Sequence, residues 1–155
     1  MIQRIQTIYL LVAGVLAGLT TFLPLAFFST GSGELFDLYS SGLRVVGGET
    51  IQGTIYMSVL ALTTTIIPFI AIFLFKNRML QMRICAVEAV LLIGYYIMIG
   101  AYYFLSCRVF EAEGIVERGF HPALFGPIVS LVLSLLAAKA IFTDELLVRS
   151  VDRIR

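Results

Sequence analysis

Four long apolar runs dominate the pattern of hydrophobic and polar positions along the chain. Residues 5–32 and 50–75 contain no charged side chain, while 84–107 and 122–142 contain one each. A helix needs about 20 predominantly apolar residues to cross a bilayer. We therefore predict four membrane-spanning helices, near residues 7–28, 54–75, 84–106 and 123–142.

The segments between the runs predict how the helices are connected. The polar turn between the second and third runs is very short, so these two helices should form an antiparallel hairpin. The Gly- and Ser-rich segment 29–53 is longer, and alternation over 34–46 around a break at 40–42 predicts a small strand-like hairpin. For 108–121 we expect a solvated turn or a helix extension. The predicted fold class is an all-α, four-helix membrane bundle, forming one integral-membrane domain over residues 1–155.

Composition supports burial in lipid. Of the 155 residues, 59% are hydrophobic and 14% are charged, and the mean hydropathy is +0.97. A soluble domain is usually about half apolar and a quarter charged, so a core in so short a chain could not hold this excess. The net charge of +1 gives no global field that would recruit nucleic acid.

The distribution of Lys and Arg predicts the orientation, because cytoplasmic loops of membrane proteins are enriched in these residues. Three of the cations lie on one side of the predicted membrane, namely Arg44, Arg108 and Arg118. Eight lie on the other side, namely Arg4, Lys76, Arg78, Arg83, Lys139, Arg149, Arg153 and Arg155. Both termini are therefore expected in the cytoplasm.

The C-terminal segment 143–155 alternates basic and apolar residues at helical spacing. Leu147, Val151 and Ile154 share one face, and Arg149 and Arg153 share another. We expect an amphipathic helix that continues from the fourth span and lies at the inner membrane surface. A frayed helix end and a partner-docking helix are the alternatives.

Glu88 and Lys139 are the two charges inside the predicted spans. Each lies five residues from a charged residue at the same membrane boundary, so they should sit at equal depth on neighbouring helices. We favour a structural ion pair between the helices over two side chains that reach the interface separately, and over a proton or substrate relay. A relay would use Tyr95 and Tyr102, which follow Glu88 on its helical face and could form a polar track.

Small residues at four-residue spacing predict close helix packing. Gly14 and Gly18 form a GxxxG motif, and Ser130 and Ser134 repeat in the last span. Packing inside the bundle is favoured over a homo-oligomer. Pro24 and Pro68 are expected to bend their helices.

We find no constellation typical of catalysis or metal binding. His121 is the only histidine, and its spacing from nearby acidic residues matches no zinc pattern. Cys85 and Cys107 stand too far apart along one predicted helix to form a disulfide. The sequence predicts no metal, no cofactor and no enzymatic activity.

Three stretches resemble a known family: MIQRIQTIYLL at the N-terminus, FLFKNRMLQMRIC at 73–85 and DELLVRSVDRIR at the C-terminus. They resemble a domain-of-unknown-function family of small four-span membrane proteins in Bacteroidetes. The resemblance covers essentially the whole chain and implies a bacterial inner-membrane location. It implies no activity, substrate or site residue.

Three functions are consistent with these features. We favour a non-enzymatic scaffold or accessory subunit that contacts membrane lipid and a protein partner or a second copy. The alternative is a small proton-coupled transporter or carrier that uses Glu88, and the third is a lipid-acting membrane enzyme.

Overall fold

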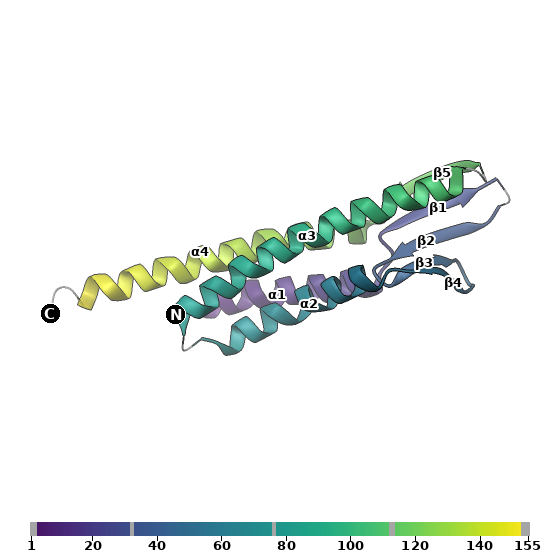
Figure 1. The fold of residues 1–155 in the computed structure, drawn as a ribbon. Helices are drawn as coiled ribbons and strands as arrows, with labels where there is room; N and C mark the ends of the chain where they lie inside the picture. Colours follow the sequence, from purple (N-terminus) through teal and green to yellow (C-terminus); the bar gives the residue numbers. More distant parts are fainter. Residues whose placement is uncertain (1–2, 32, 76, 112–113, 153–155) are drawn as a thin grey trace.

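A computed structural model describes residues 3–31, 33–75, 77–111 and 114–152, and shows a helical bundle joined to a β-sheet at one end (Figure 1). The helices are α1 (Gln3–Phe22), α2 (Ile55–Phe73), α3 (Arg78–Glu111) and α4 (Gly126–Asp152), and a short 3-10 helix, η1 (Pro122–Phe125), precedes α4. The strands are β1 (Ala26–Thr30), β2 (Leu35–Tyr39), β3 (Gly42–Val45), β4 (Thr50–Gly53) and β5 (Ile115–Phe120). We call the two ends of the bundle the sheet end and the terminal end, because both chain termini lie opposite the sheet.

The predicted all-α fold class is wrong, because the chain builds a five-stranded antiparallel sheet. The strand order is β4-β3-β2-β1-β5. The segment 108–121, expected as a turn or helix extension, supplies β5, which pairs with β1. Strand β1 was hidden in the first apolar run: α1 ends at Phe22, and Pro24 follows the helix instead of bending it. All four helices are nonetheless long and apolar enough to cross a membrane.

The bundle interior follows one spacing on every helix. Each helix has a row of buried positions that alternates between steps of four and three residues, a repeat that favours left-handed packing. They are 6, 10, 13, 17 and 20 on α1; 57, 61, 64, 68 and 71 on α2; 81, 85, 88, 92, 95 and 99 on α3; and 130, 134, 137, 141 and 144 on α4. Many of these residues are Ala, Ser or Thr, while large apolar side chains point outward. Small residues inside and large ones outside are typical of helices that associate in lipid.

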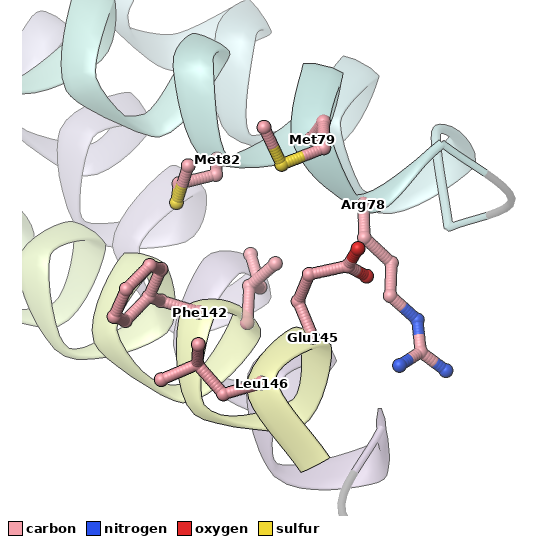
Figure 2. A pocket seen from close by; sticks show the side chains of 7 residues that line it. Arg78, Met79, Met82, Phe142, Glu145 and Leu146 are labelled. Carbon is pink, nitrogen blue, oxygen red and sulfur yellow. The ribbon is translucent and has the colours of Figure 1, made fainter. Parts of the chain in front are cut away.

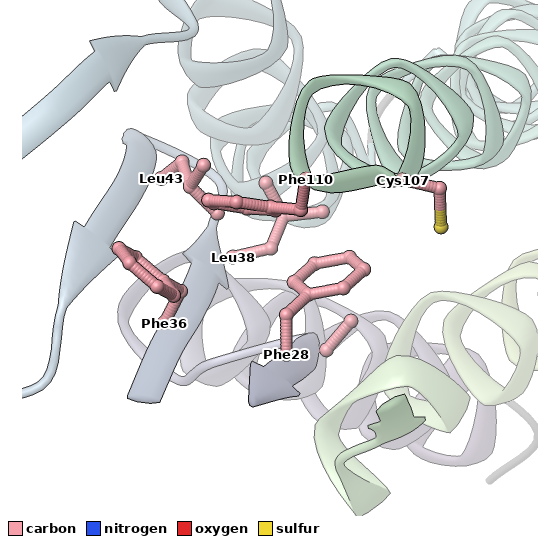
Figure 3. Close-up of a cluster of buried hydrophobic side chains, with 7 residues drawn as sticks. Phe28, Phe36, Leu38, Leu43, Cys107 and Phe110 are labelled. Atoms are coloured by element: carbon pink, nitrogen blue, oxygen red, sulfur yellow. The ribbon is translucent and has the colours of Figure 1, made fainter. Parts of the chain in front are cut away.

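The sheet packs one face against the end of α3, which extends beyond the other helices at the sheet end (Figure 1). Phe110 and Cys107 of α3 contact the sheet side chains Phe28, Phe36 and Leu38 (Figure 3). The rings of Phe36 and Phe110 are 4.5 Å apart. No described helix covers the opposite face of the sheet (Figure 1), and we call it the open face.

The described part of the C-terminal segment is helical and continues the fourth apolar helix, as predicted. Helix α4 continues without a break through Asp152 and projects past the other helices at the terminal end (Figure 1). Pro68 lies inside α2, as expected.

Candidate functional site

Glu88 is the most unusual side chain in the bundle. It is 0% exposed, and neither of its carboxyl oxygens has a hydrogen-bond partner. The Ser134 hydroxyl lies beside this carboxyl, yet it too is buried without a hydrogen bond of standard geometry. Three polar atoms are thus unsatisfied at one point between α3 and α4. Buried polar atoms without partners are rare, and each one calls for an explanation.

The predicted ion pair between Glu88 and Lys139 is not formed in this structure. Lys139 is exposed, on the side of α4 that also exposes Leu135 and Phe142. Glu88 instead faces Ser134, about 7–8 Å further from the terminal end along α4 than Lys139. The equal-depth argument failed because α3 begins at Arg78, well before the predicted span. Lys139 can still direct its ammonium group toward the membrane surface by itself.

An apolar layer separates Glu88 from the terminal end. Leu10, Ala71, Cys85, Ala137 and Ile141 form this layer, and we call it the alanine layer. Cys85 lies one turn before Glu88, and Ala71 lies two residues before the end of α2. Because Cys85 and Ala71 share this layer, Glu88 lies only about 7–8 Å, measured along the bundle axis, from the end of α2.

A small pocket of about 80 Å³ opens below this layer, between α3 and α4 (Figure 2). Its walls are mostly apolar and include Met82 and Ile141, which also belong to or pack against the alanine layer. Arg78 and Glu145 are the two charged residues among its lining. Nearby, the side chain of Gln6 on α1 donates a hydrogen bond to buried Asp144 on α4.

Of the predicted inner-face cations, Arg78 and Arg83 lie in the first two turns of α3, at the terminal end. Arg83 is exposed on α3. Lys76 and Arg153 lie outside the described residues, and for Arg149 the structure describes the helical backbone only.

A second polar centre joins the sheet to the bundle. The Tyr95 and Ser40 hydroxyls lie 2.7 Å apart, and Ser40 Oγ also donates to the Thr20 carbonyl oxygen at 3.3 Å. The Thr54 and Ser58 hydroxyls both donate to the Ser40 carbonyl oxygen. The predicted track residue Tyr95 is thus used to hold the β2–β3 turn, while Tyr102 packs, partly buried, beside the same cluster.

The open face of the sheet carries several polar side chains. Asp37 and Tyr39 alternate with the covered residues of β2, so they project from the open face. Arg44 is the cross-strand neighbour of Asp37, and its guanidinium lies 5.2 Å from the centre of the Tyr39 ring. His121 Nε2 lies 3.4 Å from Asp37 Oδ1. Within the described part of the chain, no three His, Cys, Asp or Glu side chains gather as metal ligands would.

The small residues pack helices inside one chain. A Cβ atom at Gly14 would lie 3.0 Å from the Phe69 ring of α2, and one at Gly18 would lie 3.3 Å from Thr65. The Ser130 hydroxyl donates to the Ala13 carbonyl oxygen at 2.9 Å, which ties α4 to α1. These stripes therefore face neighbouring helices of the same bundle.

Sequence reasoning missed Ser40 and Asp37, and the link between Gln6 and Asp144. The alternation of apolar and polar residues over 34–39 could have predicted that Asp37 lies on the exposed face of its strand. No local pattern could indicate that Ser40 reaches Tyr95 or that Gln6 reaches Asp144, since these partners are far apart in the sequence.

Comparison with known proteins gives one family. The family described as "Domain of unknown function (DUF4293)" matches residues 2–154. No curated protein matches the chain.

Proposed function

Because the chain belongs to the DUF4293 family of unknown function, and its four helices are suited to a membrane, we propose that it is a non-enzymatic scaffold or accessory subunit of the bacterial inner membrane. The observation that carries this proposal is the sheet. One face is fixed to α3, and the other is left free as a rigid polar surface at one end of the bundle.

The rigidity of this surface supports a role in binding a partner. Tyr95, Thr20, Thr54 and Ser58 all hold the turn at Ser40, so the β2–β3 hairpin cannot rotate freely on the bundle. A preorganised surface loses little conformational entropy when a partner binds.

The positive-inside rule supports the orientation. The terminal end carries most of the cations of the sequence, which favours its placement in the cytoplasm. The sheet then stands on the outer side of the membrane.

Charge indicates the chemistry of the partner. Glu34, Glu49 and Glu117 are exposed in or beside the sheet, and Asp37 lies on its open face. Among the described strand residues the exposed cations are Arg44 and Arg118, fewer than these four acids. A protein partner with a basic segment would complement the acidic excess and would bind more weakly at high salt.

A photo-crosslinking residue in place of Tyr39 tests the proposal in native membranes. We expect one discrete adduct of defined mass, which weakens with salt and in the double variant Glu49→Lys, Glu117→Lys. The matched control places the same residue at Tyr56, which is 75% exposed in the first turn of α2, and should give no protein adduct. If position 39 gives no adduct in native membranes, the scaffold proposal is wrong.

A further inference from the structure

The unsatisfied atoms at Glu88 and Ser134 limit what this point of the bundle can bind. An unpaired carboxylate in an apolar interior has a large desolvation cost, which a bound cation or proton removes. Glu88 is fully buried, so no cationic side chain of a partner helix can reach it. The ligand must therefore be small.

We propose that Glu88 and Ser134 form an intramembrane binding site for one exchangeable proton. Three oxygen atoms are available: the two of the carboxyl group and the Ser134 hydroxyl. A carboxylic acid can donate to the hydroxyl oxygen or accept from the hydroxyl hydrogen, so this pair suits a proton. A hard metal cation prefers about six or more oxygen ligands, which is more than the pair supplies.

The proton exchanges with the terminal end of the bundle. On that side, only the alanine layer separates Glu88 from the pocket, and three of its five members are the small residues Ala71, Cys85 and Ala137. Met82 and Ile141 line the pocket and also contact or form this layer. Glu145 lines the pocket, so a carboxyl group lies on the far side of the alanine layer from Glu88.

Toward the sheet end, a second pocket of about 350 Å³ lies between α3 and α4, and Leu92 and Leu131 line it. Apart from Tyr96, its walls are apolar, so it holds no carboxyl group that could pass on a proton. Leu92 follows Glu88 by one turn on α3, and the next buried residue on this stripe is Tyr95. The Tyr95 hydroxyl already bonds to Ser40. One proton taken up and released from a single side makes the site a sensor of proton concentration on that side.

Few other ionisable groups face the site. Cys85, which is buried one turn from Glu88, is the nearest ionisable side chain among the described buried residues of α3. On α4 the nearest buried acid toward the terminal end is Asp144, which is bonded to Gln6 and lies about 15 Å from Ser134 along the helix. The buried stripes of α1 and α2 contain no ionisable side chain within the described ranges.

Infrared spectroscopy of the full chain in lipid tests the proposal. The difference between wild type and Glu88→Gln should contain the carbonyl band of a protonated carboxylic acid at neutral pH. This band should shift in D₂O, because the proton exchanges, and should change frequency in Ser134→Ala. Glu145→Gln should slow the exchange, and Lys139→Gln should leave the band unchanged.

Each of the following results would overturn the proposal. A carboxylate band at Glu88 at neutral pH would show that no proton is bound. A band that never shifts in D₂O would show a sealed structural group. A band that disappears on addition of Na⁺, or in Lys139→Gln, would assign the site to a metal ion or an ion pair. If Glu88→Gln does not fold, the frequency change in Ser134→Ala is the deciding measurement. An unchanged frequency there contradicts the proposal.

Discussion

At the scale of single residues, the polar side chains between the helices differ in whether they make hydrogen bonds. The hydroxyl groups of Thr20, Thr64 and Ser130 bond to helix carbonyl oxygens, as is common in membrane helices. Glu88 and Ser134 do not. The sequence indicated that Glu88 was exceptional. It could not predict that Glu88 faces Ser134, because this contact depends on how α3 and α4 are shifted along each other.

Tyr95→Phe should loosen the sheet from the bundle. The variant removes the hydroxyl that bonds to Ser40, and one buried hydrogen bond contributes about 1 kcal/mol to the free energy of unfolding. Amide hydrogen exchange should become faster around residues 40–54. Tyr102→Phe is the matched control, since Tyr102 lies partly buried in the same cluster and its hydroxyl makes no hydrogen bond within the described chain. Equal exchange rates in both variants would contradict this role of Tyr95.

At the scale of elements, the pattern of hydrophobic and polar positions predicted the four helices and the hairpin of β2 and β3, but not β1, β4 or β5. The helices could be predicted because a membrane requires long apolar runs whatever their neighbours. Strand β1 could not, since AFFST continues an apolar run and only its pairing with β2 and β5 makes it a strand. Strand β5 contains adjacent Glu117 and Arg118, which break the alternation that identifies a half-buried strand.

Gly14→Leu should separate α1 from α2. Even a Cβ atom there meets the Phe69 ring and Pro68, and overpacking typically costs about 1–3 kcal/mol. Gly100→Leu is the control, because a Cβ atom at Gly100 has open space and both changes raise helix propensity alike. Thermal unfolding in mild detergent should show a lower midpoint for Gly14→Leu. A midpoint equal to that of Gly100→Leu would show that these helices do not need close approach.

At the scale of the whole molecule, the bundle fits a bilayer and the sheet lies beyond it. Helix α2 has 19 residues, and so a length of about 28 Å, close to the hydrocarbon thickness of about 30 Å. Exposed aromatic residues mark both of its ends: Tyr56 near the sheet end and Phe73 near the terminal end. Aromatic residues are enriched at membrane interfaces. The number of helices long enough to span a membrane could be predicted from the sequence. The sheet could not, because it forms when β5 of the second loop pairs with β1, far away in the sequence.

Single cysteines can test the proposed orientation in whole cells. Glu49→Cys places a thiol near the tip of the sheet, and Asn77→Cys places one in the turn at the terminal end, both at exposed positions. A membrane-impermeant thiol reagent should label only the first in intact cells and both after lysis. The native Cys85 and Cys107 are buried, so background should be low. Labelling of Asn77→Cys in intact cells would reverse the orientation.

The shared sheet also sets an order of events during biosynthesis. Strands β1 to β4 are synthesised before α3, yet their apolar face is covered by Cys107 and Phe110 at the far end of that helix. The free edge of β1 is closed only by β5, which follows α3. The first loop therefore stays only partly folded until α3 and β5 have been synthesised. Nascent chains halted before residue 110 should expose this loop to proteases and chaperones, and completed chains should protect it.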